Sequence, residues 1–255
     1  MAWATAYARF AKLCHKKIRE TEAIFEELAG VHQQAREDKT VLRISIDAKA
    51  MVKIGSFSRN GQSRVIVRAA DHDFTADETL TPFGIFLPDF DEVYLYFAPS
   101  GLTADFIGDC LCDFWRIIRA SFPTIATLLI NLDNGPENHS RRTQFMQRLT
   151  DFADTFRLTV QLAYYPPYHS KYNPIERVRG VLEQHWNGAL LDSRQTVLRF
   201  ASTMTYNRGS PIVKFIDRAY QTGVHLTQQA MTALESRFQR LPGLGKWFVQ
   251  IVPLC

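Results

Sequence analysis

The order of apolar runs and turn signals in this 255-residue sequence predicts an α/β fold, a mixed sheet with helices packed on its faces. Short alternating runs on either side of the Asn60-Gly61 turn signal are typical of a hairpin. From residue 103 onward helical and strand patterns alternate. The run 127–132 is continuously apolar, as in a central strand covered on both faces. We therefore expect such a sheet with an N-terminal helix and a C-terminal helical extension.

The expected strands are short runs of alternating or continuous apolar residues that are bounded by turn signals. They are expected at 41–46, 51–57, 64–69, 93–97, 127–132 and 158–163. The expected helices show apolar residues at helical spacing among charged ones. They are expected at 16–36, at 103–121 with Thr103 as a cap, at 141–156, and in a helix that starts near Pro174.

Composition allows a well-packed domain and permits a nucleic-acid partner. Hydrophobic residues make up 46% of the chain, and the formal net charge is +4. No uncharged apolar run reaches about 18 residues, so we expect no membrane span. Cys110 and Cys112 lie in an apolar stretch and no Cys-x-x-Cys pair occurs, which indicates buried thiols, no zinc site and a cytoplasmic location.

Three acidic residues lie where an expected strand ends or an expected helix begins. Asp47 ends the first strand, Asp133 ends the central strand, and Glu176 lies in the first turn of the helix after the last strand. Because sites in open α/β sheets form beyond the carboxyl ends of strands, Asp47 and Asp133 would lie side by side if their strands are neighbours. The alternative for each acid alone is a turn, cap or helix-start role.

A cluster of these carboxylates would have a definite chemistry. Three converging carboxylates repel one another and need a cation to stay ionised, and hard oxygen ligands select Mg²⁺ or Mn²⁺. Two such ions about 3.5–4 Å apart can clamp the attacking and leaving oxygens of an in-line phosphoryl displacement. The acids therefore predict metal-dependent chemistry on phosphodiesters.

The segments around the three acids resemble those of a known family. Residues 42–50 (LRISIDAKA), 128–135 (LLINLDNG) and 165–176 (YPPYHSKYNPIE) resemble the first-, second- and third-acid segments of the Rhodopirellula-type DDE transposases, an insertion-sequence family. Further similar segments are 71–74, 82–86, 185–188, 190–193 and 203–205. The resemblance runs from about residue 38 to the end, and its most specific part is the third-acid segment.

This resemblance implies a ribonuclease H-like fold with Asp47, Asp133 and Glu176 as catalytic carboxylates that bind two Mg²⁺ ions, for which Mn²⁺ substitutes. The implied activity is hydrolysis at transposon ends followed by strand transfer from the 3′ hydroxyl. The implied partner is double-stranded DNA, at the element ends and at the target. A homodimer is also implied, because two ends are processed together, as is a nucleoid-associated location in bacteria.

The family pattern also sets the expected domain organisation. Such transposases carry an N-terminal helix-turn-helix region for end recognition, whereas about 40 residues precede the first strand here. We expect 1–40 to be a helical segment without that recognition domain, 41–190 the catalytic core, and 191–255 a helical extension of the same domain. The turn after the second acid, 133–138, also has fewer glycines than the family pattern.

Residues near the third acid are candidate DNA contacts, namely His169, Lys171, Asn173 and Arg177. Lys171 and Arg177 would meet backbone phosphates, and Asn173 would contact a base or orient Glu176. The alternatives are ordinary loop roles before Pro174 and a solvated helix face. A solvated face is also the interpretation of Asp109 and Asp113.

Two other functions remain open at this point. A different ribonuclease H-like nuclease, such as a junction resolvase, would use the same metals without joining strands. A truncated, inactive remnant would only bind DNA. The presence of all three acids argues against the inactive remnant.

Overall fold

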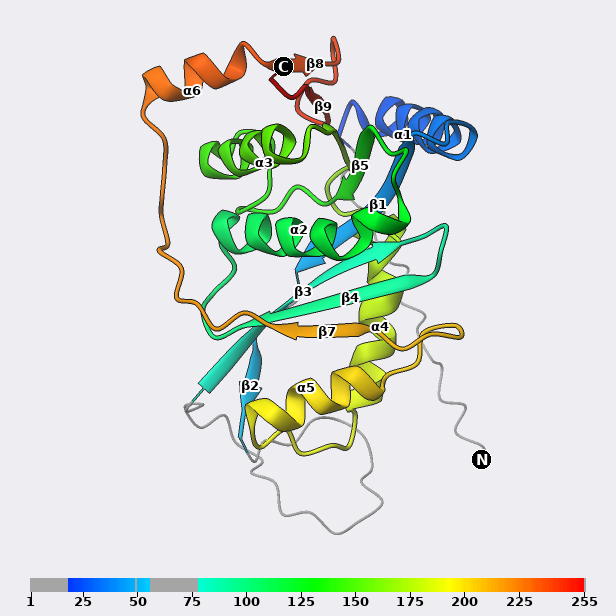
Figure 1. Ribbon diagram of the computed structural model, residues 1–255, viewed down its shortest axis with the longest axis vertical. Helices are drawn as coiled ribbons and strands as arrows, with labels where there is room; N and C mark the ends of the chain where they lie inside the picture. The colour runs from blue at the N-terminus through cyan, green and yellow to red at the C-terminus, as the bar shows by residue number, and fades with distance from the viewer. Residues whose placement is uncertain (1–17, 49, 56–77, 255) are drawn as a thin grey trace, which may run out of the picture.

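A mixed sheet organises the computed structural model, which describes residues 18–48, 50–55 and 78–254 (Figure 1). Its described strands follow the order β7-β4-β3-β1-β5-β6-β9-β8, and β2 pairs with β3. Their bounds are β1 Val41–Ala48, β2 Val52–Ile54, β3 Glu78–Leu87, β4 Glu92–Ala98, β5 Thr127–Leu132, β6 Thr159–Tyr164, β7 Ile212–Phe215, β8 Phe238–Arg240 and β9 Phe248–Ile251.

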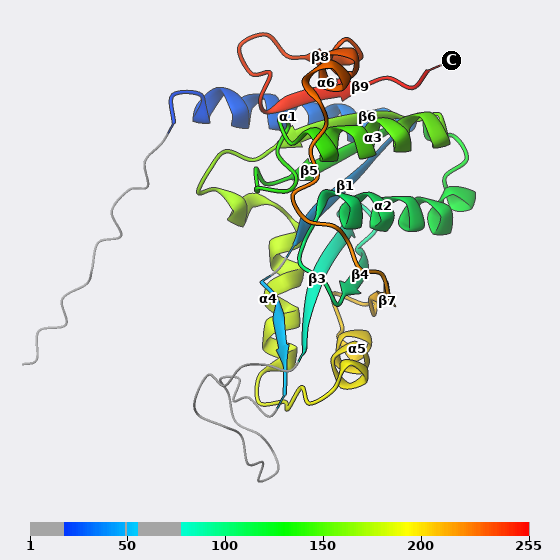
Figure 2. The same cartoon turned by 90° about the vertical axis from the view of Figure 1, so that its left-hand side faces the viewer.

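Helices cover both faces of this sheet (Figure 2). Helices α2 and α3 lie on one face, and α1 and α4 lie on the other, with α5 packed against α4. Their bounds are α1 Thr21–Glu37, α2 Ala104–Ile118, α3 Thr143–Phe156, α4 Ile175–Trp186, α5 Arg194–Thr203 and α6 Gln228–Glu235. In the described ranges no helix has the length and apolar character that crossing a membrane requires.

The strand β1 shows why the two faces differ. Leu42, Ile44 and Ile46 alternate with Arg43, Ser45 and Asp47, so one face of the strand is apolar and the other is polar. The apolar side joins the core formed with α2 and α3, where Phe106 of α2 contacts Phe83 of β3 at 6.0 Å between ring centroids. The polar side lies beneath α1 and α4. The sheet therefore carries a buried polar row on the face where α4 sits.

Several sequence-based expectations agree with the observed elements. The strand predicted at 127–132 is β5, and the helix predicted at 103–121 is α2 followed by a short 3-10 turn. Thr103 caps that helix, because its side chain accepts a hydrogen bond from the Phe106 amide. Cys110 and Cys112 are free thiols, the first buried and the second half-buried. The predicted Asn60-Gly61 turn and the strand at 64–69 lie outside the described residues.

The C-terminal region differs from the helical extension expected for 191–255. It contains α5 and α6, but it also adds β7 in parallel to β4 and β9 antiparallel to β6. Both strands are four residues long, and their pairing partners lie far away in the sequence. The region therefore extends the sheet at both edges.

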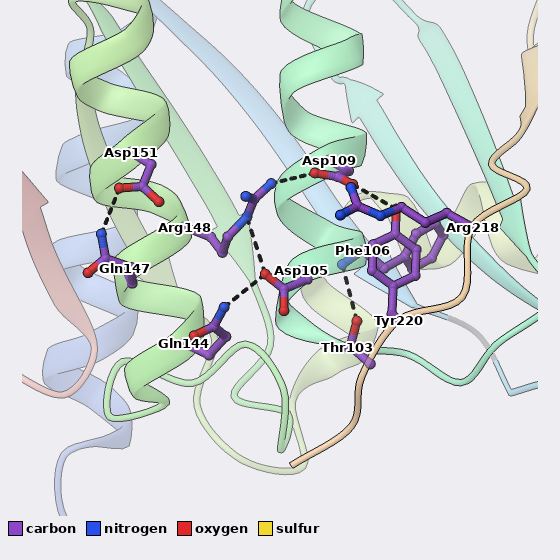
Figure 3. Close-up of polar contacts among 10 residues, drawn as sticks. All are labelled: Thr103, Asp105, Phe106, Asp109, Gln144, Gln147, Arg148, Asp151, Arg218 and Tyr220. Atoms are coloured by element: carbon purple, nitrogen blue, oxygen red, sulfur yellow. Dashed lines mark hydrogen bonds and ion pairs between the residues drawn. The ribbon is translucent and has the colours of Figure 1, made fainter. Parts of the chain in front are cut away.

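A charged network fastens the segment after β7 onto α2 and α3 (Figure 3). Asp109 on α2 accepts hydrogen bonds from Arg148 on α3, from Arg218 at 2.8 Å and from the Tyr220 hydroxyl at 2.9 Å. Arg148 also lies 3.6 Å from Asp105. The solvated face expected for Asp109 is thus replaced by an ion-pair network, and Asp113 likewise pairs with Lys214 at 2.8 Å.

Replacing Asp109 with Asn should lower the free energy of unfolding by about 1–3 kcal/mol, because three donors lose their charged acceptor. Urea unfolding followed by circular dichroism measures this change. Gln147→Ala is the matched control on α3, since its bond to Asp151 is exposed, and it should change stability by less than about 0.5 kcal/mol. Equal stability of the two variants would show that the network contributes nothing.

Candidate active site

The first two acids come together because their strands are neighbours. β1 and β5 pair in parallel, with Ser45 opposite Asn131. Asp47 and Asp133 each lie two residues further along, which places both side chains on the same face because side chains alternate along a strand. Neighbouring strands are about 4.8 Å apart. The negative charge of Asp133 accordingly contributes to the raised pKa of Asp47.

Helix α4, which carries Glu176, is anchored to β1 by buried hydrogen bonds. The Ser45 hydroxyl donates to the Asn173 side-chain oxygen and accepts from the Ile175 amide at 3.0 Å. The Asn173 amide group donates to the Ile46 carbonyl at 3.1 Å. Ser45 and Asn173 are both fully buried. These bonds hold the start of α4 against β1 near Ser45, which lies two residues before Asp47.

Close packing against β3 holds the same end of α4. A Cβ atom added at Gly84 would lie 3.0 Å from Cδ1 of Ile175. Gly84 pairs with Asp47 across β1 and β3. A side chain at this position would push the helix away from the sheet, so the glycine permits the close approach of Glu176 to the strand ends.

Arg179 connects the third acid with the first. Its Nη1 atom donates to an Asp47 carboxylate oxygen and lies 3.4 Å from Oε1 of Glu176, one helical turn earlier. The Asp47 side chain is only 6% exposed, and those of Arg179 and Glu176 are 20% and 30% exposed. Asp47 and Glu176 therefore share one guanidinium group.

Burial dominates the ionisation of Asp47. It raises the pKa of this carboxyl to about 7, against the opposing effect of Arg179 and with help from the charges of Asp133 and Glu176. The carboxylate form is therefore costly in this position and is favoured by any additional cation. Binding of a cation beside Asp47 would therefore be coupled to loss of the proton from its carboxyl group.

Asp133 is held by the loop that follows β5. Its Oδ1 atom accepts a hydrogen bond from the Asn138 side chain at 3.1 Å. The Asn138 carbonyl in turn accepts from the buried Tyr164 hydroxyl at 2.7 Å. Asp133 is thus supported, through Asn138, by Tyr164 of β6 and not by its own strand.

The donor chemistry of the three acids fits a divalent cation. All three supply hard carboxylate oxygens, and the pKa of Asp47 is raised by burial first and then by the charges of Asp133 and Glu176, which a bound cation would counter. Within the described part of the chain, no group of three or more His, Cys, Asp or Glu side chains lies close enough together to hold a metal ion as it stands. Instead, Arg179 provides the positive charge between Asp47 and Glu176.

The four expected DNA contacts fall into different environments. Lys171 and Arg177 are exposed, and His169 is half-buried, with its Nδ1 atom 2.8 Å from the Pro167 carbonyl oxygen. Asn173 is fully buried and bonded to Ser45 and Ile46, which corrects the expected contact with DNA. Its amide is used to support α4, in agreement with the alternative that it orients Glu176.

Ser45 belongs to the site but was not singled out from the sequence, and Arg179, like Arg177, was expected to meet DNA phosphates or to lie on a solvated helix face. Ser45 carried a weak signal, because it is a small residue on the polar side of an alternating strand, two positions before Asp47. Arg179 lies three residues after Glu176 and therefore on the same side of the helix. A solvated arginine on the helix surface would have the same spacing, so the sequence does not distinguish the two roles. Their roles depend on contacts between distant segments.

Comparison with known proteins gives a consistent assignment. Residues 7–253 match the family model described as "Rhodopirellula transposase DDE domain". None of the curated proteins matches the sequence.

Solved structures are similar in fold. The Mos1 transposase paired-end complex with left transposon end has a TM-score of 0.52 at 13% identity, over 78% of this chain and 58% of that chain. The Mos1 mariner paired end complex with Mn has a TM-score of 0.52 at 12% identity, over the same shares. The present chain thus spans 58% of the length of these relatives and has their ribonuclease H-like fold.

Ser45→Ala should lower the free energy of unfolding by about 1–3 kcal/mol, because it leaves the buried Asn173 oxygen and Ile175 amide without their partner. Urea unfolding measures the change. Ser140→Ala, which removes a bond to the Lys246 carbonyl at the other side of the sheet, is the matched control for loss of a buried hydroxyl. Backbone hydrogen exchange at the start of α4 should increase in Ser45→Ala and not in Ser140→Ala. Unchanged exchange there would contradict the anchoring role.

Asp47 should contribute a loss of stability to the metal-free protein as pH rises from about 4 to about 7, whereas buried His32, whose pKa is lowered to about 4, contributes in the opposite direction. Between these values folded Asp47 keeps a proton that the unfolded chain releases, since its pKa is raised to about 7 from 3.8. Urea unfolding at a series of pH values in EDTA measures the slope. Asp47→Asn should shift the slope toward greater stability at higher pH, because the His32 contribution then acts without the opposing one, and identical slopes for wild type and variant would rule out the raised pKa of Asp47.

Proposed function

We propose that this chain, which belongs to the Rhodopirellula transposase DDE-domain family, is a DNA transposase catalytic domain that cuts element ends and joins them to target DNA. The observation that carries this proposal is the placement of Asp47 and Asp133 on neighbouring parallel strands, with Glu176 on a helix anchored beside them. Carboxylates in such positions could hold the paired metal ions that polymerases and nucleases use for in-line displacement at phosphorus.

Two displacement reactions make up the proposed activity. In the first, water attacks a phosphodiester at the element end, the bond from phosphorus to the 3′ oxygen breaks, and the strand ends in a 3′ hydroxyl. In the second, the oxygen of that hydroxyl forms a bond to the phosphorus of a target phosphodiester, the bond from this phosphorus to the target's 3′ oxygen breaks, and the proton passes to the displaced oxygen directly or through solvent. No covalent protein intermediate is needed.

Asp47, Asp133 and Glu176 are the residues that would hold divalent cations, two Mg²⁺ ions or Mn²⁺ in their place. Bound ions would supply stabilisation of the attacking and leaving oxygens. Support comes from the hard oxygen donors and from the similarity in fold to the Mos1 mariner paired end complex with Mn. Arg179 occupies the position of positive charge between two of the acids, and it would give up this contact as cations bind.

The remaining residues position these groups. Ser45 and Asn173 hold the start of α4, and Asn138 holds Asp133, so each acid is fixed by a bond to a different part of the sheet. Exposed Lys171 and Arg177 flank Glu176 and would contact DNA phosphates. His169 would lie beside them on the same DNA-contacting surface.

The proposal extends to partners and organisation. Double-stranded DNA at element ends and target sites would be the substrate, and a homodimer would process two ends together. Residues 1–40 would precede a catalytic core at 41–190. Residues 191–255 would complete the same domain, in line with the strands they add to the sheet.

The wild-type chain should nick supercoiled plasmid in the presence of Mg²⁺ or Mn²⁺, and it should join a pre-cut 3′ end to target DNA. Asp133→Asn should reduce both rates by at least about 100-fold, because even groups that only orient metal ligands contribute about 10- to 100-fold. Gel assays of nicking and of strand transfer measure the rates.

Gln147→Ala on the exposed surface of α3 is the control and should retain wild-type rates. Nicking without strand transfer would indicate a resolvase-like nuclease. Equal rates for wild type and Asp133→Asn would reject the carboxylate mechanism.

A further inference from the structure

Aromatic side chains gather at the start of α4. Phe25 of α1 meets His169 and Tyr172 edge-on, with ring centroids 5.4 and 5.2 Å away. The rings of His169 and Tyr172 are nearly parallel, 20° apart, with centroids separated by 6.0 Å. Tyr168 precedes His169 in the chain. We call Phe25, Tyr168, His169 and Tyr172 the aromatic rim.

The two tyrosines of the aromatic rim are turned toward solvent. Tyr168 is 68% exposed and Tyr172 is 53% exposed, the highest values among aromatic residues in the described ranges. Tyr168 also has a φ angle of 65°, in the left-handed region that a bulky side chain rarely adopts. Such backbone strain costs about 1–3 kcal/mol and persists mostly at functional positions.

Backbone hydrogen bonds hold the loop that bears the aromatic rim. The Tyr165 amide donates to the Leu132 carbonyl at 2.9 Å, and the Tyr172 amide donates to the His169 carbonyl at 3.0 Å. Asn173, which follows at once, is bonded to β1. The backbone that carries the rings is therefore held before any ligand arrives, which reduces the entropy lost on binding.

Position and charge indicate what the aromatic rim binds. Tyr172 is the member of the aromatic rim nearest to Glu176 in the sequence and precedes it by four residues. The ammonium group of Lys171 lies 5.1 Å from the centre of the Tyr172 ring. Arg177 is exposed one residue beyond Glu176. Aromatic faces beside cations are the combination that binds single-stranded nucleic acid, because bases stack on rings and phosphates meet the cations.

We propose that the aromatic rim is a stacking platform for unpaired bases at the end of a DNA strand, with Tyr168 and Tyr172 as the stacking groups and Lys171 as a phosphate contact. This inference rests on the proposed function, which supplies DNA ends at this site. By stacking the terminal bases, the platform would hold these nucleotides next to the carboxylates and away from their complementary strand.

The test compares two short fluorescent duplexes that differ only in their single-stranded 3′ extension. One extension carries two normal nucleotides, and the other carries two abasic nucleotides with the same phosphates. Fluorescence anisotropy in EDTA measures both dissociation constants without cleavage. Wild type should bind the base-bearing duplex about 5- to 100-fold more tightly, the range expected for stacking on an aromatic side chain.

Variants separate stacking from general DNA binding. Tyr172→Ala and Tyr168→Ala should bring the ratio of the two constants close to one, while Tyr172→Phe keeps it. Phe90→Ala, which truncates a ring that is 52% exposed and lies outside the aromatic rim, should also keep the wild-type ratio. Thermal melting confirms that each variant is folded.

The outcomes are distinguishable. Tight binding of both duplexes with a ratio near one in wild type would overturn the stacking proposal and leave the proposed DNA chemistry intact. A failure to bind either duplex would overturn both. If the tyrosine variants keep the ratio but change the sedimentation coefficient, the aromatic rim is a contact between subunits and the proposal is wrong.

Discussion

The parallel pairing of β1 with β5 is the constraint on which the site depends. Its register sets Ser45 against Asn131 and so directs Asp47 and Asp133 to the same face of the sheet. A slip by one residue would turn one of the acids into the apolar core beneath α2 and α3, because side chains alternate along a strand. Core packing of Ile44, Ile46 and Ile130, all fully buried, therefore fixes the catalytic geometry as well as stability.

The same register creates an electrostatic cost that the rest of the site offsets. Asp47 is buried among like charges, and burial is the main reason that its pKa is raised to about 7. Arg179 from α4 reduces this cost by pairing with Asp47 and Glu176. The helix that brings the third acid thus also brings a cation, and the buried bonds of Ser45 keep both within reach of the strand ends.

Patterns that depend on one segment could be predicted from the sequence. The continuous apolar run of β5, the Thr103 cap and the helix that begins after Pro174 are all local features, and the structure has them. Strand β3 was not predicted, because Pro82 and Gly84 are unusual in a strand interior. Gly84 is explained only by the approach of Ile175 from a helix about ninety residues later in the chain.

The site itself was predictable to a lesser extent. The positions of Asp47, Asp133 and Glu176 at the ends or starts of elements follow from local patterns, while their roles remain a proposal. Arg179 bridges two acids only through tertiary packing, and Asn173 was expected at DNA although it is buried. A buried polar group and an exposed one have the same sequence signal, so only the fold separates them.

Direct binding of Mn²⁺ tests the central claim that the three carboxylates act together on divalent cations. Electron paramagnetic resonance of free Mn²⁺, titrated with the protein in the absence of DNA, gives the affinity. Wild type should bind Mn²⁺, and Asp47→Asn, Asp133→Asn and Glu176→Gln should each weaken binding by at least about 10-fold. Unchanged affinity in any one of the three variants would show that this residue is not part of a shared metal site.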